Sequence, residues 1–399
     1  MIEQALEIDI LKNLSLDMHQ GINTVTENVE YLESGIPILQ SKHITKGFLN
    51  LEDTKYLSEK DYLKYKDKYQ ANIDDVLVCN IGTIGKSLRI DKAEKFLIAW
   101  NLFLIKLDNK KLYSQYFAHY LNHLSDQNYF DKFLTGGTVK FINKKTMGNI
   151  QVPLPPLPQQ QKIANILDAA DALRQNDKAL IAKYDELTQA LFLDMFGDPV
   201  SNPKGWGEKS LNDLCTKITD GTHDTPLRLT EGIKFITGKH IRPFVIDYDN
   251  SDYVTEEVHN EIYRRCNPEY GDILYTNIGV NFATAAMNTV DYEFSMKNVA
   301  LLKYKREFLN GRFLESILNN EFFKDRLKRV FGIGGAQQFL SLSNIKSIMI
   351  LNPPLELQNQ FAERVAVIEE QKAIAQKSLE HSESLFNSLL QKAFKGELV

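Results

Sequence analysis

The chain has 399 residues, and its formal net charge at pH 7 is −5. This length exceeds what one ordinary hydrophobic core holds and predicts two or three domains. The negative charge excludes a protein that coats nucleic acid through bulk positive charge, but it is compatible with one that reads DNA through local clusters.

The composition is that of a folded globular protein, with 43% hydrophobic and 25% charged residues. The sequence has no apolar stretch of about 18 residues and no signal-peptide pattern at its N-terminus, so we expect no membrane span and no export. The three cysteines, Cys79, Cys215 and Cys266, form no CxxC pair. We therefore expect a cytoplasmic protein without a disulfide scaffold and without a metal site.

The first half of the chain begins with a mixed globular part. Short apolar runs such as DVLVCNI (75–81) and FLIAWNLFLIKL (96–107) are bounded by turn residues and predict strands. A helical pattern follows over 113–133. The prolines of 153–156 then mark a hard boundary, because proline does not fit inside a helix.

One long helix is predicted after these prolines, from Gln159 to Phe196. Its apolar residues recur at the spacing of a helix seam: Ile163, Leu167, Ala170, Leu173, Leu180, Tyr184, Leu187 and Leu191. The turn-rich segment 196–206 then reads as a linker.

The second half repeats this order. A strand is predicted at DILYTNIG (272–279), a helix around 312–330, and a boundary at Pro353–Pro354. A second long helix then runs to Gly396, with a similar apolar seam: Phe361, Val365, Ile368, Ala375, Leu379, Phe386, Leu389 and Ala393. At 1.5 Å per residue, each long helix measures roughly 55 to 60 Å.

Six ordered matches show that the two halves are a tandem duplication. GIPILQSKHI (35–44) matches GIKFITGKHI (232–241), DDVLVCNIG (74–82) matches GDILYTNIG (271–279), and NLFLIKL matches NVALLKY, all separated by 197 residues. At a separation of 198 residues, GGTVKFI (136–142) matches GGAQQFL and LPPLPQQQKIA matches NPPLELQNQFA; Leu191 and Phe196 match Leu389 and Phe394. Two copies of this size indicate duplicated domains and not a solenoid.

The two long helices are expected to pair with each other. A helix with one apolar stripe needs a partner, and two such helices in one chain favour an antiparallel pair that holds the globular parts apart. The alternative is that each helix packs only on its own domain.

Three apparent catalytic motifs fail on inspection. IGTIGKS (81–87) has Asn80 where a phosphate loop needs glycine, and its counterpart IGVNFAT lacks the Gly-Lys pair. NPPL (352–355) ends in leucine, where a methyltransferase uses an aromatic ring to stack on a flipped base. His119 and His123 lack the glutamate of a metalloprotease helix. We therefore predict no catalytic residues in this chain.

As a whole, the chain resembles the specificity (S) subunit of type I restriction-modification enzymes. The segments that carry the resemblance are PLPPLPQQQKIANIL, LFLDMFGDPVSNPKGW, NPPLELQNQFAERV and LLQKAFKGEL. One departure is visible: the family commonly has a Glu-Gln pair after the proline box, whereas this chain has Pro158-Gln159-Gln160 and Glu356-Leu357-Gln358.

The resemblance implies an α+β fold of two tandem, mixed α/β target-recognition domains, each followed by a long helix, with the helices paired as an antiparallel coiled coil. The domain boundaries are then 1–155 for the first recognition domain, 156–197 for the first spacer helix, 198–353 for the second recognition domain and 354–399 for the second spacer helix.

The resemblance also implies a function. Each recognition domain reads one half of a split, asymmetric site in double-stranded DNA, and the helices set the unread gap and dock two methyltransferase (modification) subunits. Motor-nuclease (restriction) subunits join that complex. The chain itself needs no cofactor, while its partners use S-adenosylmethionine, ATP and Mg²⁺. The alternative function is a tandem protein-interaction scaffold that does not read DNA; a fused methyltransferase-nuclease is disfavoured by the missing cofactor loop.

The candidate DNA contacts fall in three places that recur in both copies, because base edges and phosphates are bound mainly by Arg, Lys, Asn, Gln, hydroxyls and backbone N–H groups. The first place comprises Lys42 and His43 with Lys239, His240 and Arg242. The second is the turn with Asn80, Thr83 and Lys86, and with Asn277 and Asn281. The third is a double-glycine loop with Gly136, Gly137, Thr138 and Lys140, and with Gly334, Gly335, Gln337 and Gln338.

Overall fold

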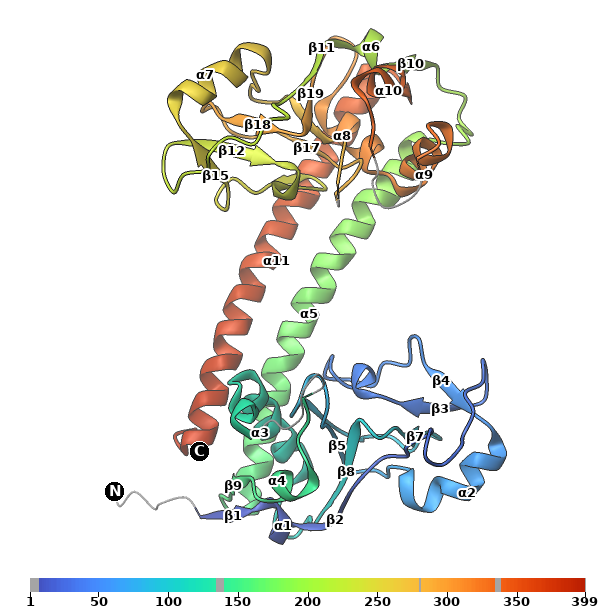
Figure 1. Ribbon diagram of the computed structural model, residues 1–399, viewed down its shortest axis with the longest axis vertical. Helices are drawn as coiled ribbons and strands as arrows, with labels where there is room; N and C mark the ends of the chain where they lie inside the picture. Colours follow the sequence, from blue (N-terminus) through green and yellow to red (C-terminus); the bar gives the residue numbers. More distant parts are fainter. Residues whose placement is uncertain (1–6, 134–139, 280, 334–338, 399) are drawn as a thin grey trace. The chain divides into compact units, whose positions relative to one another are not determined.

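The chain folds into two compact units. The computed structural model describes residues 7–133, 140–279, 281–333 and 339–398. Unit 1 comprises residues 1–178 and 377–399, and unit 2 comprises residues 179–376. Both boundaries fall inside the two long helices, α5 (Leu157–Phe196) and α11 (Leu355–Lys395) (Figure 1). Each unit therefore contains one globular domain and a segment of each long helix.

The globular domain of unit 1 is built on three small sheets. Their strands, in sheet order, are β2 (Ser15–Gln20), β8 (Leu102–Leu107), β5 (Val76–Cys79) and β6 (Ser87–Arg89); β4 (Lys55–Leu57), β3 (Ile36–Leu39) and β7 (Leu97–Ile98); and β1 (Ile8–Ile10) with β9 (Gln151–Pro153). The helices are α1 (Leu11–Leu14), η1 (Ser41–His43), α2 (Glu59–Tyr69), α3 (Ser114–Asp126), η2 (Tyr129–Phe133) and α4 (Lys144–Gly148).

Unit 2 repeats this topology. Its sheets are β11 (Cys215–Asp220), β19 (Val299–Tyr304), β16 (Ile273–Thr276) and β17 (Ala285–Met287); β15 (Asp252–Val254), β12 (Ile233–Thr237) and β18 (Ser295–Lys297); β10 (Glu208–Ser210) with β20 (Met349–Leu351); and the hairpin of β13 (Ile241–Arg242) and β14 (Val245–Ile246). The helices are α6 (Leu211–Leu214), η3 (Gly238–His240), α7 (Glu256–Arg265), α8 (Gly311–Asn319), α9 (Glu321–Val330) and α10 (Leu342–Ser347). The shared strand order supports the duplication predicted from sequence.

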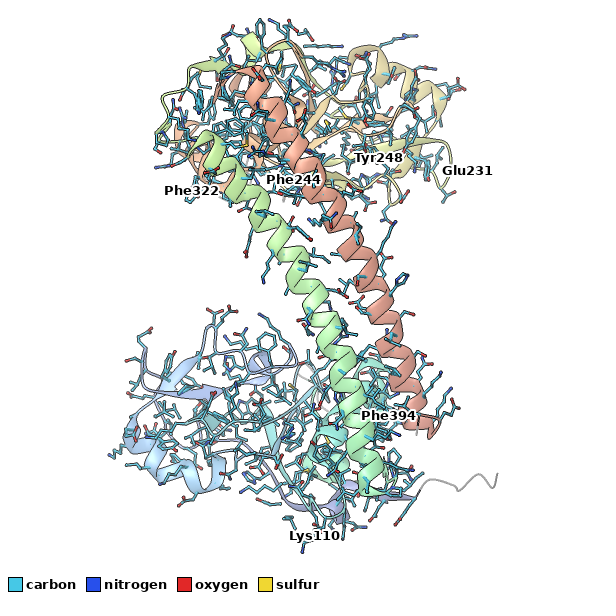
Figure 2. The ribbon with its side chains drawn as sticks, turned by 180° about the vertical axis from the view of Figure 1, so that it is seen from behind. Lys110, Glu231, Phe244, Tyr248, Phe322 and Phe394 are labelled. Carbon is cyan, nitrogen blue, oxygen red and sulfur yellow. The ribbon has the colours of Figure 1, made fainter. Side chains whose placement is uncertain are left out.

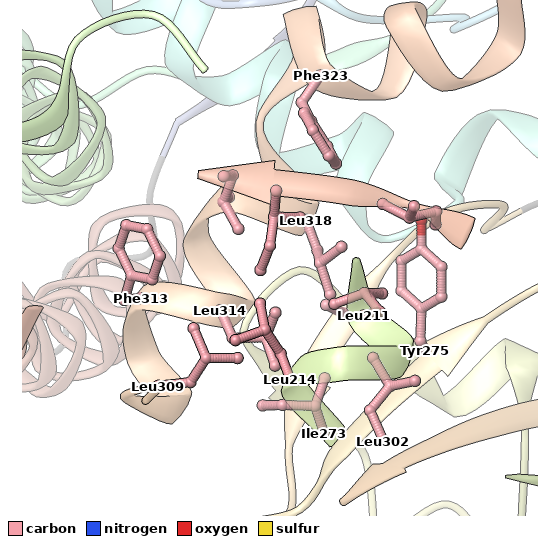
Figure 3. Packing of buried hydrophobic residues seen from close by; sticks show 14 of the residues in the cluster. Leu211, Leu214, Ile273, Tyr275, Leu302, Leu309, Phe313, Leu314, Leu318 and Phe323 are labelled. Atoms are coloured by element: carbon pink, nitrogen blue, oxygen red, sulfur yellow. The ribbon is translucent and has the colours of Figure 1, made fainter. Parts of the chain in front are cut away.

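The central strands of each four-stranded sheet, β5 with β8 and β16 with β19, are buried on both faces, which explains their uninterrupted apolar runs. Along β5, Val76 and Val78 face the core beneath α3 and α5, while Leu77 and Cys79 face the core shared with the three-stranded sheet. Unit 2 has the same alternation, and the side chains of its larger core converge between the sheet and α8 (Figure 3).

An asparagine fixes the helix that covers the edge of each sheet. On α3, Asn122 accepts a hydrogen bond from Ser87 N (2.9 Å) and donates one to Ser87 O (3.0 Å). On α8, Asn319 does the same with Ala285, at 3.0 and 2.8 Å. The single helix expected over 312–330 is in fact two, α8 and α9, because Asn320 caps a new helix by accepting from Phe323 N.

A buried glutamine in the first turn of each long helix joins the helix to the globular domain that precedes it. Gln160 accepts from Tyr113 N (2.8 Å) and donates to the carbonyls of Lys111 (3.0 Å) and Pro155 (2.9 Å). In unit 2, Gln358 likewise accepts from Asn310 N (2.9 Å) and donates to the carbonyls of Phe308 (3.1 Å) and Pro353 (2.9 Å).

Each long helix ends against the opposite globular domain. The last turns of α5 belong to unit 2, where the ring of Phe196 lies 4.7 Å from that of Phe313 on α8. The last turns of α11 belong to unit 1, where Phe394 contacts Tyr116 and Tyr120 of α3, at 5.5 and 5.1 Å between ring centroids (Figure 2). The C-terminus of the chain thus completes the unit formed by its N-terminal half.

The two long helices pack together antiparallel, so the prediction that they pair is confirmed. In unit 1, Asp177 of α5 accepts from Ser378 (3.0 Å) and Ser382 (2.8 Å) of α11, and Lys178 pairs with Glu383 at 3.1 Å. In unit 2, Asp185 of α5 pairs with Lys372 of α11.

Part of the predicted seam on α5 is wrong. Leu173, Leu180 and Leu187 are 54%, 41% and 49% exposed. Polar residues such as Asp177 take the places that face α11, so these leucines form a second, outward-facing stripe. On α11, the predicted seam residues Phe361, Val365, Ala375, Leu379, Phe386 and Ala393 are buried. No helix within the described ranges has the length and hydrophobicity needed to cross a membrane.

Candidate nucleic-acid interface

In unit 1, η1, the turn after β5 and the residues that follow the double-glycine loop lie at one end of the four-stranded sheet. The Ser41 hydroxyl of η1 donates to the carbonyls of Asn101 (2.9 Å) and Ile81 (3.3 Å), which joins η1 to the turn after β5. Ile142 N donates to Asn80 O (3.0 Å), and Ile81 forms a β-bridge with Phe141, which joins that turn to the base of the double-glycine loop. We call this region the reading end of unit 1.

Unit 2 has an equivalent reading end. Asn281, in the turn after β16, donates to the carbonyls of Gly238 (3.1 Å) and Ile241 (2.9 Å), which joins this turn to η3 and the β13–β14 hairpin. Leu340 N donates to Asn277 O (2.8 Å), and Ile278 forms a β-bridge with Phe339. The structure thus brings together segments that are far apart in the sequence, and it does so twice.

The two predicted histidines are inside the protein. His43 and His240 are 2% and 3% exposed, and the Nδ1 atom of each accepts from a backbone N–H, of Gln40 and Thr237 respectively, at 2.9 Å. Burial, and next the adjacent lysine (Lys42 or Lys239), lowers the pKa of each imidazole. Both histidines are therefore neutral at pH 7 and hold the 3-10 turn, with their rings withdrawn from the surface.

The two predicted asparagines, Asn80 and Asn277, are also buried. Asn277 donates from its side chain to Leu340 O at 3.3 Å, so it fixes the base of the double-glycine loop. Its Oδ1 atom, like the Nε2 atom of His240, has no hydrogen-bond partner among the described residues. These buried polar groups therefore support the structure of the reading end from inside.

Lysine, arginine and threonine side chains supply the exposed part. Thr83, Lys140 and Arg242 are exposed. Lys86 is half-buried and pairs with Asp126 at 2.5 Å. The remaining two lysines are exposed but engaged: Lys42 donates to Asp53 O (2.7 Å), and Lys239 pairs with Asp252 (3.1 Å). The predicted loop residues Gly136, Gly137, Thr138, Gly334, Gly335, Gln337 and Gln338 lie outside the described residues.

Sequence reasoning missed residues that lie just before β8 in unit 1 and just after β11 in unit 2. In unit 1, Trp100 is 48% exposed, and its carbonyl accepts from Gln20 at 3.3 Å. In unit 2, His223 lies 2.9 Å from Asp220 and 2.8 Å from Asn298 Oδ1. The signal was available in principle, because antiparallel pairing places the start of β8 or β19 beside the ends of its neighbours.

A cavity of about 670 Å³ borders the reading end of unit 1. Its walls come from the segment after η1, from β6 and α3, and from the paired helices, and they include Lys46, Lys86 and Arg174. Its cations are matched by carboxylates, since Arg174 pairs with Asp171 and His119 contacts Asp168. Burial alone would raise the pKa of Asp168, but the hydrogen bonds from His119 and Gln115, with the charges of His119 and Arg89, together lower it below its usual value. The cavity is polar and close to electrically balanced.

The segments that superficially resembled catalytic motifs lie in ordinary turns and helices of the fold. The segment Ile81–Lys86 is the turn between β5 and β6. His119 and His123 lie on α3, where His123 packs on the Phe394 ring at 5.2 Å. Among the described residues, no cluster of three or more His, Cys, Asp or Glu side chains is placed to hold a metal ion.

The fold and the repeated polar end together define a tandem recognition protein with two related heads, and comparison with known proteins places it among its relatives. The family model described as "Type I restriction modification DNA specificity domain" matches residues 7–183. The chain is 24% identical to the putative type I restriction enzyme MjaX specificity subunit of Methanocaldococcus jannaschii, covering 100% of this chain and 94% of that one. It is 21% identical to the EcoKI specificity subunit of Escherichia coli K12, covering 98% and 87%.

A solved structure has the same fold. The crystal structure of the type I restriction-modification S subunit from M. genitalium superposes with a TM-score of 0.60 at 17% identity, over 99% of this chain and 98% of that one. The chain is similar over its whole length to type I restriction-modification specificity subunits, and its first part matches their DNA specificity domain. It is thus a DNA specificity subunit, a non-catalytic part of a type I enzyme, as its sequence predicted.

Proposed function

We propose that this specificity subunit reads a split, asymmetric site in double-stranded DNA, one half with each unit. The observation that carries this proposal is the repeated reading end, in which the 3-10 turn, the turn after the central strand and the residues that follow the double-glycine loop meet at the same end of the sheet but present different side chains. In the alignment of the two copies, Thr45 corresponds to Arg242, and Trp100 corresponds to Lys297. Because different side chains prefer different base edges, the two half-sites should differ.

The exposed candidates divide by chemistry. Arg242 suits a base edge, because guanidinium groups make paired hydrogen bonds to guanine. Lysines at the reading ends, Lys42, Lys86, Lys140 and Lys239, suit phosphates, as does the Thr83 hydroxyl. The ion pair of Lys86 with Asp126 must then open on binding. The glycines and glutamines of the double-glycine loops remain predicted contacts, with backbone N–H groups for phosphate and Gln337 and Gln338 for adenine.

The paired helices set the length of the unread gap and dock two methyltransferase subunits, to which motor-nuclease subunits then bind. Support for docking comes from the outward-facing stripe that the pairing leaves uncovered. In unit 2 this stripe contains Leu180 and Leu187 of α5, and Val367 and Ile374 of α11 are 59% and 56% exposed. Exposed apolar residues at heptad spacing are typical of a helix surface that awaits another helix.

Methylation mapping tests this function directly. Methylated bases are mapped genome-wide in cells with and without this gene, in the presence of its methyltransferase partner. The proposal expects one split motif with unequal halves that disappears with the gene. In vitro, the chain plus partner should bind a duplex carrying that motif, and the affinity should fall with salt. Methylation of DNA by the purified chain alone would contradict the proposal.

A charge on the outward stripe tests the docking surface. Leu187→Glu should abolish co-purification with the methyltransferase subunit, because it places a charge in an apolar contact. The matched control is Glu186→Gln, a change at the neighbouring exposed position of the same helix. Equal co-purification of both variants would locate the docking surface elsewhere.

A further inference from the structure

The segment after each 3-10 turn is a small projection with the same plan in both units. Residues 43–50 (HITKGFLN) correspond to residues 240–247 (HIRPFVID) at the constant separation of 197. Asn50 N donates to His43 O (2.9 Å), and Asp247 N donates to His240 O (2.8 Å). In unit 2 the enclosed residues form the β13–β14 hairpin, with Arg242 paired with Val245 across its tip.

The base of this projection is the same in both copies. It starts at the buried histidine and continues through a fully buried isoleucine, Ile44 in unit 1 and Ile241 in unit 2. In unit 2 it is also attached to the rest of the reading end, since Asn281 donates to Ile241 O and Phe244 N donates to Ala285 O (3.2 Å). The tip is therefore held on a rigid support beside the other predicted contacts.

The tip, in contrast, differs at every position, with Thr-Lys-Gly-Phe (45–48) in unit 1 and Arg-Pro-Phe-Val (242–245) in unit 2. It also carries exposed apolar residues, since Phe48 is 53% and Val245 is 56% exposed. Arg242 is exposed and forms no ion pair with any described residue. The charge of Arg242 contributes to lowering the pKa of Asp247, after the larger effect of the Asn250 hydrogen bonds, but no salt bridge between them forms.

One tip position combines a shared backbone with an unexpected side chain. Gly47 has φ of +83°, a left-handed conformation that suits glycine, and its equivalent Phe244 has φ of +66°. A bulky residue is unfavourable there, and such residues persist where the side chain has a use. The space around Gly47 is open, so a side chain has room at this place in the fold. Unit 2 thus keeps a ring at a strained position where unit 1 keeps glycine.

We propose that these tips, 45–48 and 242–245, are specificity-determining elements that contact base pairs of their half-sites. The proposal rests on the function proposed above and assigns part of it to named residues. Arg242 reads the base edges of a G·C pair in the half-site of unit 2, and the adjacent Phe244 and Val245 make apolar contact with neighbouring bases, as with a thymine methyl group. Unit 1, with Thr45 in place of Arg242, does not read that pair in the same way.

Arg242→Ala is the first test, with methylated bases mapped in cells that express the variant and its methyltransferase partner. The expected result is relaxed specificity at one position of one half-site, by about 5- to 150-fold, with the other half-site unchanged. The control is Arg264→Ala, an exposed arginine of α7 away from the reading end, which should leave the motif as it is. Equal thermal stability of the two variants excludes a folding effect.

Two outcomes would overturn the assignment of Arg242. An unchanged motif would show that it reads no base. A uniform loss of methylation at all sites, with the salt dependence of binding reduced by about one counterion, would make it a phosphate contact. Absence of any split motif with the wild-type chain would instead contradict the proposed function itself, so the two failures are distinguishable.

Phe244→Gly is the second test, because it separates a structural role from a recognition role. Glycine fits the left-handed backbone, and this relief offsets the greater freedom of the unfolded chain and the lost contacts of the half-buried ring, so the variant should be about as stable as the wild type. The proposal expects a several-fold weaker binding of the cognate duplex by the complex despite that stability. Unchanged binding would remove Phe244 from the contact, and a lower Tm with proportionate loss of binding would make it a packing residue.

Discussion

Replacing Gln160 with methionine should weaken the joint between the first globular domain and α5. The Gln160 carboxamide makes three hydrogen bonds of 2.8 to 3.0 Å to buried or half-buried backbone groups, and its side chain is 1% exposed. Methionine has a similar volume but offers no N–H donor and only a weak acceptor. The packing is therefore kept, while one backbone N–H and two carbonyls lose their partner.

The magnitude follows from those three bonds. A hydrogen bond contributes about 1 kcal/mol net, and a buried group left unpaired costs about 1 to 3 kcal/mol, so the free energy of unfolding of unit 1 should fall by roughly 3 to 5 kcal/mol. For a unit of this size, that lowers Tm by roughly 10 °C. Differential scanning calorimetry of the full chain measures the shift.

The control is the next residue along the helix. Gln161 is exposed, so Gln161→Met should change Tm by a degree or so at most, which corresponds to the few tenths of a kcal/mol usual for surface substitutions. Gln358→Met should destabilise unit 2 to a similar extent, because Gln358 makes the equivalent three bonds. If Gln160→Met and Gln161→Met shifted the transition equally, the carboxamide would not be what holds the joint.

Three further predictions follow from other parts of the structure. Burial raises the pKa of Glu315 to about 7, so the folded state keeps a proton that the unfolded chain releases near pH 4.5. The stability difference between wild type and Glu315→Gln should therefore shift against the wild type by about 3 kcal/mol as pH rises from 4.5 to 7, measured by urea unfolding; a pH-independent difference would contradict this. Phe394→Ala should destabilise unit 1 by roughly 2 to 4 kcal/mol, although Phe394 is near the C-terminus, whereas Lys395→Ala should not; calorimetry distinguishes them. One heptad inserted near Ala179 and another near Lys377 should lengthen the unread gap by about three base pairs, since seven helical residues add about 10 Å; methylation mapping that finds the old gap would refute it.

Much of the fold could be predicted because the two halves of the chain are copies that can be aligned with each other. Six ordered matches required the two halves to share one topology, and the shared strand order agrees. The start of the first long helix could be predicted from the prolines of 153–156, and its length from the long run that lacks glycine and proline. The residues that face the other long helix were harder to predict, because the spacing of an apolar stripe does not identify the surface against which it packs. On α5, Leu180 and Leu187 continue the spacing of Ile163 and Leu167, yet only the latter two are buried.

The candidate site was predictable in position but not in detail. The matched words located η1, η3 and the turns after β5 and β16, and the fold brings them together. Pattern alone could not show that His43 and Asn80 point inward, since a polar residue in a turn is as often structural as exposed. Whether such a group is buried depends on long-range contacts, such as the bridge between Ile81 and Phe141.

The same burial explains how one fold can serve two different half-sites. The groups that stabilise each reading end, such as His43 with His240 and Asn80 with Asn277, lie inside and are the same in both copies. Stability therefore depends mainly on these buried groups, and substitutions at the exposed tips should usually change it by less than about 0.5 kcal/mol, except at the strained position of Phe244. A tip can then exchange Gly47 for its counterpart Phe244 while the support beneath it stays unchanged. DNA recognition can therefore diverge at the tips, because the buried groups beneath the tips stabilise the fold.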